Sequence, residues 1–284
     1  MTSPHASRSG LVSRIVLGLF VLSVCSLSAQ DDPQAKRRLD FMQAAVGSLE
    51  PESSELKTKD ALRATSKPLL RYSDPTRGGV NEAAVNVLLD AGVWRLGTEG
   101  RPTALVTVEI YQAPDRSRVL AMEFLSLSPE KFALKHRTKN VRWDATGSAL
   151  TMKHLPDAPK PAATAAARLV QMRQLARRFV AKERLKNESI ECRLLTQPID
   201  RYQSIAEKIV DGAIFAYANG TNPELGVVLE TDGERWQYGT LRLSSAEASV
   251  SLDGQQVASF EAYNPRGRTD GPYHNASYKM DRDK

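Results

Sequence analysis

Five carboxylates lie in or beside segments that alternate polar and apolar residues: Asp90, Glu109, Glu123, Asp211 and Glu230. Two carboxylates that converge in one cleft can serve as general acid and as base or nucleophile, the chemistry of glycoside and ester hydrolysis. Sequence spacing does not show whether residues on distant strands meet. The alternative, carboxylates at strand ends or facing solvent, therefore stays open.

Other reactive patterns are absent from the sequence. It contains no Gly-x-Ser-x-Gly elbow, His-Glu-x-x-His helix, phosphate-binding glycine loop or Cys-x-x-Cys pair. A turn at Thr146-Gly147 is expected to close a hairpin of strands 141–144 and 149–154. Folded about this turn, His136 and His154 would be offset from each other, and no further ligands surround them. We therefore expect no metal site and no cofactor.

The most distinctive stretch, residues 211–224, alternates small residues with aromatics and ends in a loop of turn formers. It predicts a buried strand packed against a helix, followed by a turn at Asn219-Gly220. The functional alternative is a backbone-rich loop at the mouth of a pocket.

A second segment resembles this stretch and predicts an internal duplication. Pro68–Ser73 aligns with Pro198–Gln203, and both contain an Arg-Tyr pair. When Asp90 and Asp211 are taken as equivalent, an aromatic residue follows four positions later and a glutamate 19 positions later in each segment. The interval from the tyrosine to the aspartate differs, 18 residues against 9, so the shared requirements of any hairpin remain the alternative. The matched positions and the loop give these binding candidates: Arg71, Tyr72, Asp90, Trp94, Arg201, Tyr202, Asp211, Phe215 and Asn219.

Strands and helices must position these side chains. Two-residue periodicity predicts strands at 69–72, 87–96, 103–111, 119–127, 132–137, 141–144, 149–154, 191–195, 212–218, 225–230, 236–243, 248–252 and 257–263. A helix from about residue 31 to 46 and a linker occupy 30–64, and residues 264–284 are expected to form a disordered tail. The fold class is α+β: a mainly antiparallel β-rich domain at 65–263, with two similar halves joined by one long amphipathic helix.

That joining helix is predicted at 162–186, where apolar residues recur every three or four positions. Its other faces are strongly basic, with Arg173, Arg177 and Arg178 as the central residues. They would form a cationic surface for an anionic glycan, a lipid headgroup or an acidic partner, or simply a solvated face.

Residues 1–29 have the composition of a secretory signal peptide, with two arginines, a short apolar run and small residues before Gln30. A retained anchor and a lipid on Cys25 are the alternatives. Cleavage would leave 37 basic and 33 acidic residues, a net charge near +4, which is mild for a nucleic-acid binder. It would also leave Cys192 as the one thiol, on a strand and expected to be buried, and no transmembrane helix.

Several of these segments resemble a family of secreted bacterial proteins of planctomycete type. The resemblance rests on Leu195–Tyr202, Asp211–Tyr217, Asn219–Glu224 and Gln171–Phe179, and it spans about residues 65–245. It implies export and a shared fold. It implies no catalytic residues, because the family has no assigned activity.

The sequence therefore favours an exported protein, periplasmic, surface-bound or secreted, that acts as a non-catalytic binding or envelope-associated module. Its partner would be an anionic envelope component or a glycan, and nucleic acid is not expected. A carboxylate-dependent hydrolase of a glycan or ester is the alternative function. A carrier of a lipid-like ligand inside a curved sheet is a third hypothesis.

Overall fold

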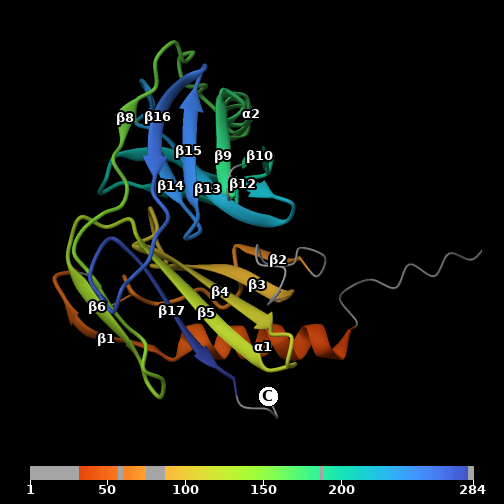
Figure 1. The fold of residues 1–284 in the computed structure, drawn as a ribbon. Coiled ribbons are helices and arrows are strands. Elements are labelled where there is room, and N and C mark those ends of the chain that lie inside the picture. Colours follow the sequence, from red (N-terminus) through yellow and green to blue (C-terminus); the bar gives the residue numbers. More distant parts are fainter. Residues whose placement is uncertain (1–31, 57–59, 75–86, 186–187, 281–284) are drawn as a thin grey trace, which may run out of the picture.

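The computed structural model describes residues 32–56, 60–74, 87–185 and 188–280. The predicted signal peptide, with Cys25, lies outside the described residues. The fold is mainly antiparallel β-sheet with two helices, which confirms the α+β, mainly β class (Figure 1).

One five-stranded sheet has the order β17-β5-β4-β3-β2. The central strands β3 and β4 are buried on both faces along most of their length, whereas Val119, Ala121 and Glu123 of β5 are only partly buried. Its strands are β2 (Leu70–Asp74), β3 (Val87–Leu96), β4 (Ala104–Gln112), β5 (Arg118–Ser126) and β17 (Tyr273–Lys279).

A nine-stranded sheet has the order β16-β15-β9-β10-β12-β13-β14-β8, and β11 also pairs with β12. Its strands are β8 (Lys153–His154), β9 (Phe179–Leu185), β10 (Glu188–Leu194), β11 (Asp200–Ser204), β12 (Ile209–Asn219), β13 (Asn222–Thr231), β14 (Trp236–Arg242), β15 (Glu247–Leu252) and β16 (Gln255–Phe260). A small third sheet joins β1 (Leu49–Ser54), β6 (Phe132–His136) and β7 (Arg142–Ala145).

Three apolar clusters hold these layers together. One lies between the five-stranded sheet and α1 (Pro33–Gly47), and another between the nine-stranded sheet and α2 (Ala165–Ala176). The third is shared by the two large sheets, with Val93 and Leu105 from one and Ile214 and Val228 from the other. The helices therefore cover the outer faces and the sheets face each other, as Figure 1 shows with α1 at the bottom and α2 at the top.

The helix starts follow from capping. Asp32 accepts a hydrogen bond from the Gln34 amide at 2.9 Å, and proline occupies the first turn of α1. Thr164 accepts from the Ala167 amide at 3.3 Å in the same way. Met42 and Met172 then bury one face of each helix against its sheet.

The prediction of a long helix at 162–186 is wrong. The helix ends at Ala176, and β9 begins at Phe179. The reason is a change of period, because Phe179, Ala181 and Glu183 alternate inward along a strand that lies between β10 and β15. The basic residues after Ala176 therefore do not continue one helix face.

The predicted disordered tail is also wrong for the described part of residues 264–284. Strand β17 pairs antiparallel with β5 along seven residues, from Tyr273↔Leu125 to Lys279↔Val119. The side chain of Trp143 donates to the Gly271 carbonyl at 2.9 Å and fixes the approach to this strand. Apolar residues spaced among polar ones in this segment complete the sheet edge.

Two further expectations need correction. The linker at 48–64 contains strand β1, which pairs with β6. The predicted hairpin of 141–144 with 149–154 does not form, because β7 pairs with β6 and β8 pairs with β14. Two Asp-Gly pairs, a sequence that favours tight hairpin turns, do close hairpins, at Asp232-Gly233 and Asp253-Gly254, with positive φ at both glycines.

Candidate functional site

Asp90, on β3, is buried beneath α1 and binds two arginines. Arg71 donates to both of its carboxylate oxygens, at 2.9 and 2.6 Å, and Arg38 of α1 donates at 3.0 Å. Arg71 also donates to the carbonyl of Ala35 at 2.6 Å. We call this set the Asp90 network; it ties a strand pair to a helix.

Asp211, on β12, has the corresponding contacts beneath α2. Arg201 donates to its two oxygens at 2.9 and 2.7 Å, Arg168 donates at 2.9 Å, and Arg201 also reaches the Ala165 carbonyl at 2.5 Å. In both networks, the helix arginine follows the accepting alanine by three residues. Arg168 belongs to the segment predicted as a basic helix, and it is buried here as the counterion of Asp211.

Two tyrosine–glutamate pairs lie on the opposite faces of these strands, between the large sheets. Tyr72 donates to Glu109 at 2.9 Å, and Tyr202 donates to Glu230 at 2.7 Å. Burial raises the pKa of both phenols well above the ordinary value of 10.0, so both are neutral donors at any physiological pH. The two phenols therefore contribute hydrogen bonds rather than ionisation near neutral pH.

The β3–β4 turn of the five-stranded sheet contacts the nine-stranded sheet, and the β12–β13 turn of the nine-stranded sheet contacts the five-stranded sheet. Arg101, in the turn between β3 and β4, donates to both oxygens of Glu230 at 2.7 Å. Arg95 donates to Asp200 at 2.7 Å, while Thr221, in the turn between β12 and β13, donates to the Ser73 carbonyl at 2.6 Å. These contacts bind the two large sheets together.

The remaining binding candidates lie apart from these networks. Trp94 and Phe215 are fully buried, but in different clusters, beneath α1 and α2 respectively. Asn219 donates to Glu183 at 2.6 Å. The structure thus groups Arg71 with Asp90 and Arg201 with Asp211, and it places these two groups on opposite outer faces rather than in one site.

The three arginines predicted as a cationic face have separate positions. Arg173 donates to Gln197 at 2.5 Å, and Arg177 caps α2 and is exposed. Arg178 follows the helix and pairs with Asp253 at 2.5 Å. The three arginines are close in sequence, but Asp253 neutralises the charge of Arg178.

Among the five carboxylates, Glu109 and Glu123 are neighbours. In the β4–β5 register Thr107 faces Glu123, so Glu109 lies diagonally across the same face. Burial raises the pKa of Glu123 well above its ordinary value, and the charge of Glu109 raises it further. Burial also raises the pKa of Glu109, although Tyr111 and Tyr72 donate hydrogen bonds to it and oppose that shift.

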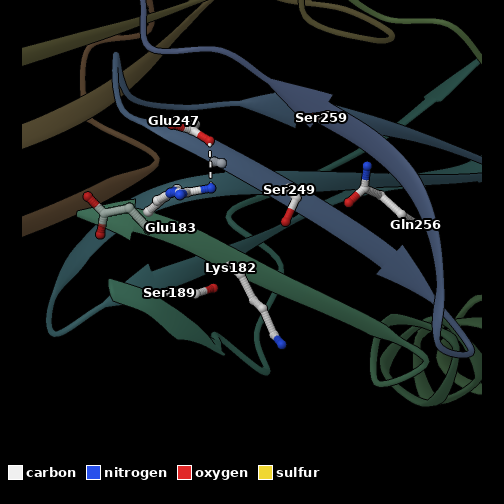
Figure 2. Close-up of a pocket in the computed structure, with 9 residues that line it drawn as sticks. Lys182, Glu183, Ser189, Glu247, Ser249, Gln256 and Ser259 are labelled. Atoms are coloured by element: carbon white, nitrogen blue, oxygen red, sulfur yellow. Dashed lines mark ion pairs between the residues drawn. The ribbon is translucent and has the colours of Figure 1, made fainter. Parts of the chain in front are cut away.

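An open polar concavity lies on β10, β9, β15 and β16, on the face of β9 and β15 opposite the apolar cluster that α2 covers, and we call it the concave face. Its volume is about 310 Å³. Figure 2 shows Lys182, Ser249 and Gln256 along it, with Arg184 and Glu247 joined as an ion pair at 3.7 Å. The full lining is Lys182, Glu183, Arg184, Ser189, Glu247, Ala248, Ser249, Gln256 and Ser259.

Sequence reasoning missed this surface because its residues carry no reactive pattern. The detectable signal was the alternation of serines with apolar residues in 247–252, which places Ser249 and Ser251 on one face; Ser259 of the next strand pairs with Ser249. Their convergence with Lys182 required knowing that β9 is a strand beside β15.

Histidines and cysteine take structural positions. His136 lies on β6 and His154 on β8, in different sheets. Within the described chain, no three His, Cys, Asp or Glu side chains gather as metal ligands would. Cys192 is buried on β10. Neither described helix is long and apolar enough to cross a bilayer.

No protein-family model, curated protein or solved structure matches this chain.

Proposed function

We propose that the protein is an exported, non-catalytic binding module whose concave face binds a hydroxyl-rich glycan. The observation that carries this proposal is the chemistry of the concave face. Ser189, Ser249 and Ser259 each offer a hydroxyl, and Gln256 offers an amide. Each of these groups can both donate and accept hydrogen bonds.

A sugar hydroxyl also donates and accepts, so such a lining matches a polyol better than it matches an apolar ligand. The Arg184–Glu247 pair adds fixed donors and acceptors with little net charge. The residues that line this face include no aromatic side chain. Binding would therefore lack ring stacking, and we expect a weak affinity for a single glycan unit.

The carboxylates support a non-catalytic role. Asp90, Asp211 and Glu230 are each held by a bidentate arginine, and Glu109 accepts from two tyrosines. Of the acids at the concave face, Glu247 pairs with Arg184 and Glu183 accepts from Asn219. These carboxylates serve as structural acceptors.

We also propose that the protein is exported and that its β-rich domain consists of two similar halves. The signal-like residues 1–29 and the resemblance to secreted bacterial proteins support a periplasmic, surface or secreted location. The similarity of the two halves is supported by the strand registers, because β2 pairs with β3 as β11 pairs with β12. The pairs Arg71↔Gly92 and Tyr72↔Ala91 correspond to Arg201↔Ala213 and Tyr202↔Gly212. The matched Asp90 and Asp211 networks support them further.

The test is retention of the mature chain, residues 30–284, on insoluble bacterial cell-wall polysaccharide, followed by calorimetry with soluble fragments. Replacement Ser249→Trp would fill the concave face and should weaken binding at least about tenfold, a loss of about 1.4 kcal/mol. Ser277→Trp on β17 is the matched control and should bind normally. Absence of retention, or retention that Ser249→Trp leaves unchanged, would contradict the proposal. Retention that instead disappears when Arg173, Arg177 and Arg178 are reversed to glutamate would assign binding to that basic surface.

A second candidate function, a carboxylate-dependent hydrolase of a glycan or ester, is favoured by one observation. Glu109 and Glu123 are diagonal neighbours, and burial raises the pKa of both. A carboxyl group that stays protonated near neutral pH can act as a general acid. Release of reducing sugar or of an ester alcohol that Glu123→Gln abolishes would support the hydrolase over the binding module.

A further inference from the structure

Strand β16 ends the nine-stranded sheet, and it differs from the other strands that end sheets in the described chain. Its sequence, residues 255–260, contains no charged residue and no proline. Proteins usually protect such edges with charges, proline or very short strands, because an edge presents unpaired backbone groups to any other strand.

The other end strands carry those protections. At the far end of the same sheet β8 is only two residues long, and one of them is Lys153. The remaining end strands all contain charged residues: β1 has Glu50 and Glu52, β7 has Arg142 and Asp144, β2 has Arg71 and Asp74, and β17 has Lys279.

We infer that β16 is an interaction edge that pairs antiparallel with β16 of a second copy of this chain. An identical partner fits because an uncharged strand can lie opposite itself without like-charge repulsion. A twofold axis beside β16 would use the same surface on both copies and would close after two chains. The paired strands would join two nine-stranded sheets into one continuous sheet.

This pairing would also bring two concave faces side by side, because Gln256 and Ser259 of β16 line the concave face. Two adjacent weak sites can together hold a polymer far more tightly than one site alone. The inference itself does not require glycan binding, so its failure and the failure of the proposed function are separable.

A six-residue strand pair buries less surface than the roughly 1,200 Å² of a stable protein interface. We therefore expect a reversible dimer that is visible only in a concentration series. Sedimentation and light scattering of the mature chain from about 1 µM to about 1 mM should show the mass rising from one chain to two.

Gln255→Lys combined with Ser259→Lys places like charges on the edge and should keep the protein monomeric over that range. Both side chains are exposed, so the circular dichroism spectrum should not change. Ser277→Lys on the edge strand β17 is the matched control and should still dimerise. Hydrogen exchange should show that the β16 amides gain protection as the concentration rises.

A mass of one chain at every concentration would overturn the inference, as would a dimer that survives the double lysine variant. Amides of β16 that are protected equally at all concentrations would mean that some other segment covers this edge, and they would overturn it too.

Discussion

Arg201 donates to both carboxylate oxygens of Asp211, at 2.9 and 2.7 Å, and Arg71 donates to both oxygens of Asp90 at 2.9 and 2.6 Å. Each aspartate is buried and also binds an arginine from the covering helix. The same set of one aspartate and two arginines therefore joins two strands to a helix twice in this chain.

Removing either carboxylate should be costly. In Asp211→Asn, the buried Arg168 and the partly exposed Arg201 lose their shared anion, and we expect the free energy of unfolding to fall by about 3–5 kcal/mol. Asp90→Asn should lower it by less, because Arg71 and Arg38 both remain partly exposed to water. Asp232→Asn, at an exposed turn, should change it by less than about 0.5 kcal/mol in urea unfolding. If Asp232→Asn and Asp211→Asn lowered the free energy of unfolding equally, Asp211 would not be the structural counterion described here.

Glu123 predicts an unusual pH dependence. Its pKa is raised in the folded state above the ordinary 4.5, so the folded state binds the proton more tightly than the unfolded chain. The stability from this group is complete below pH 4.5 and is lost as the pH rises through the folded-state pKa. Glu123→Gln should therefore make the free energy of unfolding fall less between pH 5 and pH 8 than it does in the wild type.

If Glu123→Gln and the wild type showed parallel profiles, the buried carboxyl group would not titrate as described.

Gly212 tests the close approach of β12 to Tyr202. A Cβ atom there would lie 2.4 Å from Cε2 of the Tyr202 ring, so Gly212→Ala forces the ring or the strand to move. We expect Gly212→Ala to lower the free energy of unfolding by about 1–3 kcal/mol. Gly47→Ala, with nothing within 4 Å of the added atom, is the matched control and should cost nothing. Thermal unfolding of both variants would show whether the two differ in this order.

Cys192 should be inert in the folded protein, because the thiol is buried on β10. In the mature chain a thiol reagent should label it slowly in buffer and completely in denaturant. Rapid labelling of the native protein would show that β10 opens or that the thiol is exposed.

The sequence by itself determined much of the local structure. Alternating apolar residues place strands at 87–96 and 236–243 to within a residue or two, and the Asp-Gly turns specify their hairpins, because period and turn chemistry are local properties. The N-terminal helix also follows from local signals, its Asp32 cap and Pro33.

Only the tertiary structure decided which distant residues meet. Residues 177–185 directly follow a helical pattern and share its basic character, yet from Phe179 they alternate with period two, and β10 and β15 on either side supply the backbone partners that make this segment a strand. The tail becomes β17 for the same reason, since the edge of β5 is available to it. The partners of Asp90 and Asp211, and the gathering of serines on the concave face, depend on strand order, which local sequence patterns do not encode.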